Sequence, residues 1–404
     1  MKNIIFFLTN YILNLFFYCI HPFFIFFKIK FIPIDLSRIG SFYYLDWYIS
    51  LKKMASLKKK YYYFFFYYNN NNIANLYWKN IWSKYCYNGF FSIIFLKYYQ
   101  FCVKKYDYVI HLQCLPTNHL TFLDIKKYGY TKDYLFYKNN LQCILSNNLP
   151  NISFTKNEIL KGNELLNKLN LKKGEYVCFN SRDSNYLKTS SPQINFDYHH
   201  YRNSNIITYI KSVEYLSNHK IKSLRMGKFI ENKINYKDHN FFEYSDSSFQ
   251  NDFADIFLLS NCKFLISSDC GITILPECFR IPIVYTNWPL LWRISKWNIN
   301  GVIIFKKIFS NKLKRFLSFK EMIANDFSNK KNLLRYEAKW IDNSPEEILS
   351  ATKEMNLRLT NNWKSTKEEI DLQNKFWKIF ENNDIKSSNL HVGSIFLKNN
   401  SELL

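Results

Sequence analysis

The chain has 404 residues, 48% of them hydrophobic, which is enough to build the cores of two domains of ordinary size. Nine glycines and nine prolines are few for this length and argue against a turn-rich all-β fold. The formal net charge of +23 favours anionic partners. The lysines are scattered, however, and no nucleic-acid-binding motif occurs, so membrane surfaces or phosphorylated substrates fit better than nucleic acid.

The first predicted element is a hydrophobic segment at residues 1–30. Between Lys2 and Lys28 the sequence has 25 residues without Asp, Glu, Lys or Arg, which is long enough to span a bilayer. Polar or helix-breaking residues interrupt it at Asn3, Asn10, Asn14, His21 and Pro22. We therefore expect a membrane-associated anchor, spanning or interfacial, with a buried first helix as the alternative. The lysines that follow predict a location at the cytoplasmic face of the inner membrane, or in the cytoplasm.

Residues 31–150 are predicted to form an N-terminal α/β domain. A glycine turn containing Arg38 and Gly40 follows its first strand. A polar stretch at 146–153 predicts the boundary to the next domain. The predicted elements are strands at 31–35, 61–68 and 106–112, and helices at 41–51 and 78–100.

A linker helix and a second α/β domain are predicted next. Thr155, with Glu158 three positions later, is typical of a helix start and places a linker helix within residues 151–175. Residues 176–325 then alternate strands and helices, as expected of a parallel sheet. The predicted strands are 176–179, 223–226, 241–244, 264–267, 283–286 and 302–305, and the helices are 205–218, 252–259 and 272–279. Residues 326–404 are expected to be helical and polar, with one helix starting at Ser344 and another at 363–382.

Polar residues follow three of the predicted strands, and this pattern points to a phosphate site. Arg182 follows the strand 176–179, Arg225 and Gly227 end the next one, and a turn at 268–271 follows the strand 264–267. An arginine at the carboxyl end of a parallel strand can bind a phosphate with two hydrogen bonds, and a glycine turn before a helix offers free N–H groups. The alternatives are a surface ion pair for Arg182 and an ordinary strand-to-helix turn. The candidate phosphate-binding residues are Arg182, Arg202, Arg225, Gly227, Ser268, Asp269, Gly271 and Thr273.

Metal and cofactor motifs are not found in the sequence. No Asp-x-Asp, Walker A, GxGxxG or zinc spacing occurs, so we expect neither a metal nor a cofactor. The adjacent His199 and His200 point in different directions and are unsuited to one metal, although one of them could contact a substrate. Asp252 and Asp255 are expected to be a helix cap and a solvent-facing residue, with a catalytic role as the alternative.

The chain resembles a family of bacterial glycosyltransferases of surface-carbohydrate biosynthesis, of the GT-B-like two-domain type. The resemblance runs from residues 38–40 and the helix at 154–169 to the C-terminus. Its most specific blocks are 178–187 (CFNSRDSNYL), 201–203, 225–227, 252–258, 262–271, 282–287, 342–348 and 393–397. The family pattern has His where this chain has Asn180 and Ser41, so this chain would lack an acid–base group that either histidine supplies in the family.

This resemblance implies two Rossmann-like domains with C-terminal helices and a hydrophobic N-terminal segment. It also implies a metal-independent glycosyltransferase that moves a sugar from a nucleotide-sugar donor to a surface-polysaccharide or lipid-linked acceptor. The second domain would bind the donor, and the first domain would present the acceptor at the membrane. His111, at the end of a predicted strand, and Asp183 are the candidate catalytic residues. The alternative is a non-catalytic membrane-associated protein that binds a nucleotide or polyanion.

Overall fold

A computed structural model describes residues 2–53, 62–68, 72–106, 149–190, 192–193, 195–291, 300–379 and 390–404. The chain separates into two compact units, Met1–Thr117 and Asn118–Leu404, which are treated individually below. The predicted strand at 106–112 lies outside the described residues, apart from Tyr106 at the end of a helix. The predicted domain boundary at 146–153 lies partly outside them and stays a prediction.

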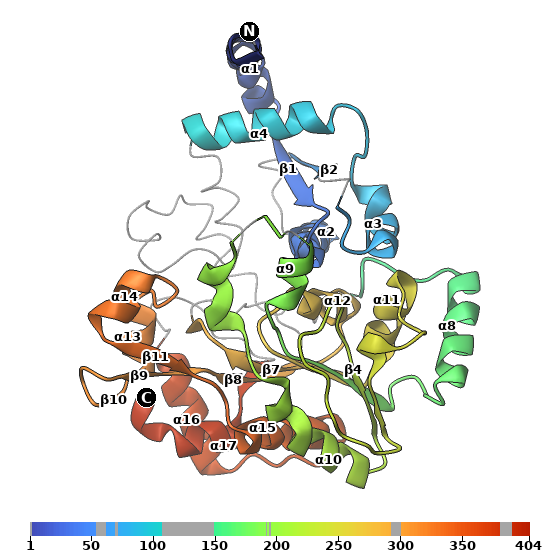
Figure 1. Cartoon of the computed structure of the whole chain (residues 1–404), viewed down its shortest axis with the longest axis vertical. Helices are drawn as coiled ribbons and strands as arrows, with labels where there is room; N and C mark the ends of the chain where they lie inside the picture. Colours follow the sequence, from blue (N-terminus) through green and yellow to red (C-terminus); the bar gives the residue numbers. More distant parts are fainter. Residues whose placement is uncertain are drawn as a thin grey trace. The chain divides into compact units, whose positions relative to one another are not determined.

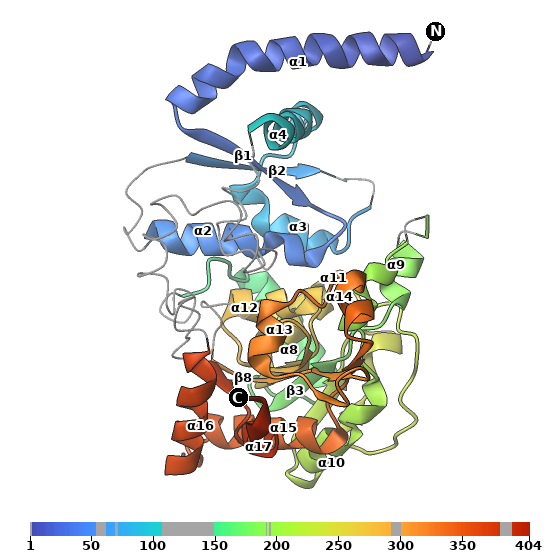
Figure 2. The ribbon, with the colours of Figure 1, turned by 90° about the vertical axis from the view of Figure 1, so that its left-hand side faces the viewer.

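The first unit contains a two-stranded parallel sheet between helices. Strand β1 (Ile29–Asp35) pairs in register with β2 (Tyr62–Tyr68), which confirms both predicted strands. Helix α4 (Ser92–Tyr106) covers one face, and α2 (Tyr43–Lys53) and α3 (Leu76–Trp82) lie on the other (Figure 2). The predicted helix over 78–100 is wrong between α3 and α4, because Tyr87 pairs with Phe66 and breaks the helical path.

Helix α1 (Lys2–Phe26) precedes this sheet and packs across α4. It extends for 25 residues and contains Pro22. Among the residues that the structure describes, no helix combines the length and the apolar character needed to cross a membrane. The interfacial form of the predicted anchor stays a prediction.

The second unit is built on a seven-stranded parallel sheet with helices on both faces (Figure 1). The strand order is β12-β8-β7-β6-β3-β4-β5, and every neighbouring pair is parallel. This confirms a mixed α/β fold with a large parallel sheet. The strands are β3 (Tyr176–Asn180), β4 (Lys222–Arg225), β5 (Phe241–Phe242), β6 (Phe264–Ser267), β7 (Ile283–Trp288), β8 (Gly301–Phe305) and β12 (Leu390–Val392).

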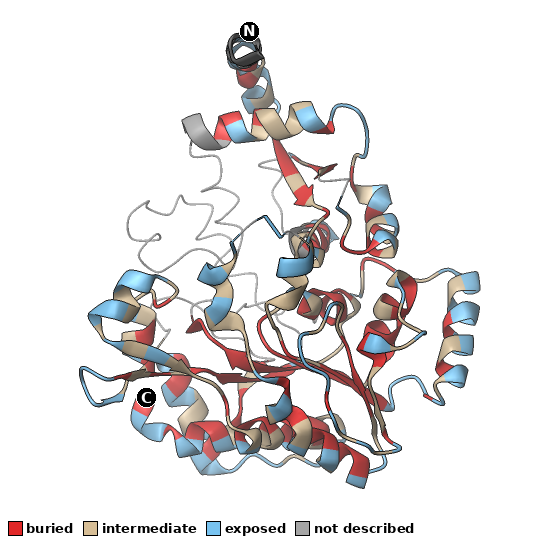
Figure 3. Cartoon of the chain, viewed as in Figure 1, coloured by how far each residue is buried: buried red, intermediate tan, exposed pale blue. Residues whose placement is uncertain are grey.

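Buried residues follow the central strands, and the outer faces of the helices are exposed (Figure 3). Helices α8, α11 and α12 pack on one side of the sheet, whereas α10, α15 and α17 pack on the other. The sequence dictates this layering, because runs such as Gly301–Phe305 are apolar at every position and fit a strand covered on both faces. The helices are α8 (Lys156–Lys168), α9 (Asn185–Ser190), α10 (Ile210–Asn218), α11 (Asp252–Asn261), α12 (Ile274–Phe279), α13 (Phe319–Ala324), α14 (Lys330–Arg335), α15 (Pro345–Leu359), α16 (Lys367–Lys378) and α17 (Ser394–Asn399).

Two predicted helix starts are confirmed by their hydrogen bonds. Thr155 caps α8 and Ser344 caps α15, each in a reciprocal capping box with a glutamate three residues later. Such a cap satisfies N–H groups that have no partner within the helix and contributes about 1 kcal/mol.

The wholly helical C-terminal region predicted from the sequence is wrong in two places. Strand β11 (Ala338–Ile341) joins β9 (Lys307–Ser310) and β10 (Arg315–Phe316) in a small antiparallel sheet. Strand β12 extends the main sheet by pairing with β8. Both strands are short, so the alternation of apolar and polar residues that indicates a strand is too brief to be recognised in a polar region.

Candidate functional site

The strand order places a topological switch point between β3 and β6. From β3 the chain passes outward to β4 and β5, then returns with β6 on the other side of β3. In open parallel sheets, ligands bind outside the carboxyl ends of the strands at such a point. The backbone N–H of Arg182, after β3, donates to Oγ of Ser268, after β6, at 2.8 Å. The two strand ends are therefore joined directly.

Arg182 lies half-buried at this point. Its Nη1 donates to the carbonyl oxygen of His199 at 3.3 Å and to Oδ1 of Asn203. Burial, and next the charge of Arg202, lower the pKa of Arg182 to about 10. Among the described residues, no carboxylate lies in ion-pair contact with Arg182. The surface ion pair considered from the sequence is therefore not formed with any of them.

Arg202 is brought to the same place by a 3₁₀ helix at Asp197–Arg202. Its Nη2 contacts Oδ1 of Asp269, which follows β6, at 2.9 Å. Burial opposes the charge of Arg202, but Asp269 outweighs it and the pKa of Arg202 is raised. The Nε of Arg202 is buried and has no hydrogen-bond partner among the described residues.

Lys306 completes the group and was missed in the sequence. It directly follows β8, its side chain is 3% exposed, and its Nζ lies 2.7 Å from Oδ1 of Asp342. Nζ also donates to the carbonyl oxygen of Asn203, whose side chain accepts from Arg182. A signal was available, because Lys306 follows the apolar run Gly301–Phe305 in the same way that Arg182 follows its own strand.

We call Arg182, Arg202 and Lys306 the basic cluster. Burial lowers the pKa of Lys306, Asp342 opposes this, and the charge of Arg182 lowers it further. Three cations thus share a partly buried place with two carboxylates in ion-pair contact, Asp269 and Asp342, while the charge of Asp183 acts on Arg182 without contact. Charge-assisted hydrogen bonds to a phosphate or carboxylate are what such a place can supply.

In the turn at 268–271, the side-chain hydroxyl groups form hydrogen bonds with backbone groups of the protein. Ser268 Oγ accepts from Arg182, Ser267 Oγ donates to the Ser268 carbonyl at 3.1 Å, and Thr273 Oγ1 donates to the Cys270 carbonyl at 2.9 Å. Gly271 begins a 3₁₀ turn that leads into α12, close to the predicted helix start. The hydroxyl contacts stabilise the turn, so any anion here would meet backbone N–H groups and the basic cluster.

Arg225 and Gly227 lie at the end of β4 and have structural partners. Arg225 is 2% exposed, its Nη1 lies 3.2 Å from Glu243 Oε2, and it also donates to the Asn232 carbonyl. Gly227 has φ of +148°, and a Cβ there would meet Ile230 at 3.0 Å and Asn180 at 3.4 Å. The structure therefore brings Arg182, Arg202, Ser268 and Asp269 together but gives Arg225 a carboxylate partner of its own.

The two predicted catalytic residues have different outcomes. His111 lies outside the described residues. Asp183 accepts hydrogen bonds from the backbone N–H groups of Asn185 at 2.9 Å and Glu231 at 3.1 Å. These contacts organise the start of α9 and the loop after β4. His200 lies 3.1 Å from the exposed Asp197, in a local i,i+3 pair.

The predicted glycine turn of the first unit follows β1. Arg38 Nε lies 3.9 Å from Oδ2 of Asp35, and Oδ1 of Asp35 accepts from the hydroxyl of Ser37 at 2.7 Å. Gly40 lies in a 3₁₀ turn at Ile39–Phe42. These contacts close the turn between β1 and α2.

The expectation for Asp252 and Asp255 is wrong. Asn251, not Asp252, caps α11 with its side chain. Asp255 does not face solvent, because its carboxylate accepts a 2.7 Å hydrogen bond from the Tyr244 hydroxyl. Burial raises the pKa of Asp255 to about 6, although the hydrogen bond from Tyr244 opposes the shift.

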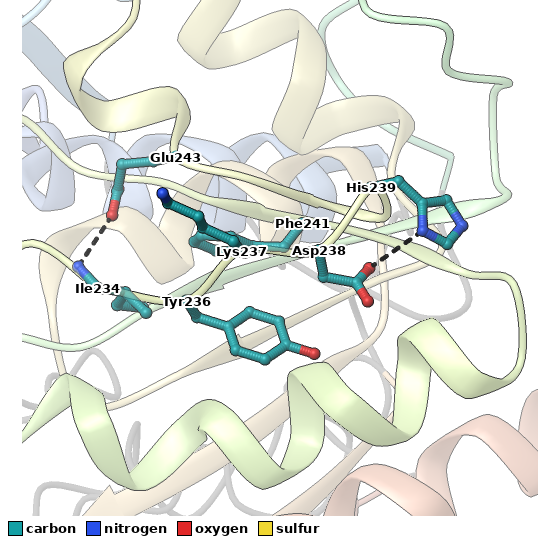
Figure 4. Close-up of a pocket in the computed structure, with 7 residues that line it drawn as sticks. All are labelled: Ile234, Tyr236, Lys237, Asp238, His239, Phe241 and Glu243. Carbon is teal, nitrogen blue, oxygen red and sulfur yellow. Dashed lines mark hydrogen bonds and ion pairs between the residues drawn. The ribbon is translucent and has the colours of Figure 1, made fainter.

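A shallow pocket lies beside β5, apart from the basic cluster (Figure 4). Asp238 accepts from Ser217 Oγ at 2.6 Å and from the Asn240 N–H at 2.7 Å, and these bonds lower the pKa of Asp238. The lining holds none of the predicted site residues, although Glu243 connects it to Arg225. The lining residues are Ile234, Tyr236, Lys237, Asp238, His239, Phe241 and Glu243.

Comparison of the sequence with models of known protein families gives no match. Comparison with curated proteins gives no match either. Within the described ranges, no three His, Cys, Asp or Glu side chains are grouped so that they could hold a metal ion. A functional assignment therefore depends on the geometry of the switch point.

Proposed function

We propose that this protein is a glycosyltransferase that binds a nucleotide-sugar donor at the switch point between β3 and β6. The basic cluster is the observation that carries the proposal. It lies where parallel sheets bind nucleotides, and its three cations outnumber the two carboxylates that contact them directly. A nucleotide sugar presents phosphate oxygens that suit two guanidinium groups and an ammonium group.

The chemistry follows from that charge. In glycosyl transfer, the bond between the sugar's anomeric carbon and the phosphate oxygen breaks, and the electron pair leaves with the nucleotide. An acceptor hydroxyl forms the new bond and gives its proton to a base. Arg182, Arg202 and Lys306 would stabilise the negative charge that develops on the leaving phosphate. His111 and Asp183 remain the candidate bases.

The finer architecture belongs to the same proposal. We infer two Rossmann-like domains of the GT-B-like type, in which the second unit binds the donor and the first presents a surface-polysaccharide or lipid-linked acceptor. The parallel pair β1–β2, with a helix in its crossover, supports a Rossmann-like first domain. We further propose that the protein belongs to the bacterial surface-carbohydrate family that it resembles, and works at the cytoplasmic face of the inner membrane.

A second function is favoured by one observation. Asn180 stands where the resembling family has His, and its side chain is used within the fold: Nδ2 donates to the Met226 carbonyl at 3.0 Å and Oδ1 accepts from the Cys270 thiol. A protein with the donor site but no acid–base group would bind a nucleotide without turning it over. A non-catalytic nucleotide- or polyanion-binding relative is therefore the alternative.

One experiment separates the two. A panel of nucleotide sugars is titrated calorimetrically and then assayed for release of free nucleotide. Binding with slow release of nucleotide supports the transferase, binding without any release supports the alternative, and no binding contradicts both.

The variant Arg182→Lys should keep the fold and weaken nucleotide-sugar binding by at least about tenfold, because lysine cannot offer the planar pair of donors. The control is Lys188→Arg on α9, which leaves the cluster unchanged. Equal affinities for wild type and Arg182→Lys would move the donor site elsewhere.

A further inference from the structure

Helix α1 presents a narrow stripe to the protein and a broad apolar surface to its surroundings. On the stripe, Phe17 is 1% exposed and contacts the rings of Tyr98 and Phe101 on α4, while His21 donates to or accepts from the Tyr98 hydroxyl at 2.8 Å. Seven large apolar side chains of α1, among those whose burial is described, are between 49% and 78% exposed. They are Tyr11, Ile12, Leu15, Phe16, Phe23, Ile25 and Phe26.

These exposed side chains form a face rather than a scatter. Tyr11, Leu15 and Phe26 lie about half a helical turn away from Phe17, and Ile12 and Phe23 flank them. No charged residue interrupts the helix between Lys2 and Lys28. A contiguous exposed apolar face of this kind typically marks a site of interaction with another protein or with a membrane.

The charge of the first unit identifies that surface. Residues 1–106 contain fourteen lysines and arginines against two aspartates and no glutamate. A second copy would bring two strongly positive units together, which Coulomb repulsion opposes. Anionic lipid headgroups would instead be attracted, and each basic residue near such a surface adds to binding.

The packing of α1 decides its orientation to that surface. Figures 1 and 2 both show α1 crossing α4 on the side away from β1 and β2. The ring contacts of Phe17 and Phe24 with Tyr98 hold one side of the helix on the protein. Lipid can therefore reach the opposite side only.

We propose that α1 lies in the plane of an anionic membrane surface, with Tyr11, Leu15, Phe23 and Phe26 directed among the lipid chains and α4 on the aqueous side. The inference depends on the first unit alone and is independent of the proposed transferase activity. The basic residues attract the protein to anionic headgroups, and the apolar face supplies the part of the affinity that salt does not screen.

The test uses the full chain and lipid vesicles in a flotation assay. The protein should float with vesicles of phosphatidylcholine mixed with phosphatidylglycerol. Less protein should float with vesicles of phosphatidylcholine alone, or with the mixed vesicles when salt is added. The double variant Leu15→Ser, Phe26→Ser should lower the partition coefficient by at least about tenfold. The control Leu160→Ser, Leu334→Ser removes similar exposed side chains from the other unit and should bind like the wild type.

Three results would overturn the inference. Equal binding of wild type and the α1 double variant would show that this face does not enter the lipid. Resistance of the bound protein to alkaline carbonate extraction would show a spanning helix. Absence of binding to the anionic vesicles would show that the face does not meet lipid, and dimers that the α1 double variant dissociates would then show that a second copy covers it.

Discussion

The basic cluster and the Arg225–Glu243 pair lie at the ends of neighbouring strands of one sheet, yet their charges are balanced differently. Arg225 has one carboxylate partner and a carbonyl, and it is almost wholly buried. In the basic cluster, two carboxylates contact three cations, and Arg202 Nε is buried without a partner among the described residues. The first arrangement is complete in itself, whereas in the second no carboxylate among the described residues contacts Arg182, and we propose that an anion binds there.

This difference shows that the role of an arginine at the end of a strand cannot be inferred from its position in the sequence alone. Arg182 and Arg225 give the same signal in the sequence, a cation at the end of a buried strand. Their roles separate only when the carboxylates that meet them in space are known. We therefore expect substitutions near Arg225 to change stability and substitutions in the basic cluster to change affinity.

Arg225→Met should have the largest effect. It leaves Glu243 and the Asn232 carbonyl without their cation, and breaking a buried pair typically costs about 3 kcal/mol or more of unfolding free energy. Denaturant unfolding measures the loss, and the nucleotide affinity of the remaining folded protein should be unchanged. Arg315→Met, in an exposed pair with Glu321, is the control and should cost far less. If Arg225→Met lowers the unfolding free energy only slightly but weakens nucleotide binding, Arg225 belongs to the binding site and the comparison is wrong.

Asp255→Asn should sharpen the structural side of the comparison, because Asp255 contacts Tyr244 next to Glu243. The folded pKa of about 6 exceeds the usual 3.8, so the folded protein holds a proton that the unfolded chain releases. The contribution of Asp255 to stability is therefore present below about pH 4 and is lost as the pH rises to about 6. Asparagine keeps the acceptor without the charge, so the variant should gain on the order of 3 kcal/mol relative to wild type above pH 6. A difference that does not vary with pH would contradict this.

Lys306→Gln tests the residue that the sequence did not reveal. It removes one cation from the basic cluster and should weaken nucleotide binding about tenfold, or roughly 1.4 kcal/mol. Lys307→Gln is a matched control, because the neighbouring ammonium group faces Glu347 at 2.7 Å instead. Calorimetric titration compares the two. Equal losses in both variants would point to a general loss of positive charge or of fold rather than to a site.

Asp269→Asn should have the smallest effect on affinity, with the opposite sign. Removing this carboxylate frees Arg202 and makes the basic cluster more positive, so affinity for a nucleotide alone should rise about threefold. If Asp269 also holds the sugar, affinity for the complete nucleotide sugar should fall instead. If neither the affinity for the nucleotide nor that for the nucleotide sugar changes, Asp269 is not part of the binding site.

Much of the second unit could be predicted because its signals are local. Apolar runs such as Gly301–Phe305 predict buried strands, and Thr155 with Glu158 predicts a cap that depends on three neighbouring residues. The strand β12 could not be predicted, because three residues carry too little pattern and its partner β8 is distant in sequence. The same limit applies to the site. Arg182 was found from its own strand, but its contact with Asn203 and the approach of Lys306 are products of tertiary packing.

Strand β12 has a consequence for the synthesis of the chain. It pairs with β8 only after about 85 further residues have followed Phe305, which takes roughly 4 to 17 s at ordinary rates of translation. During that interval the nascent sheet ends in β8, whose five residues are wholly apolar and whose outer hydrogen-bonding groups lack a strand. Such an edge invites pairing with other nascent chains. The ribosome-bound intermediate is therefore the stage at which this protein should depend most on chaperones, and slowing of translation after β8 should increase its aggregation.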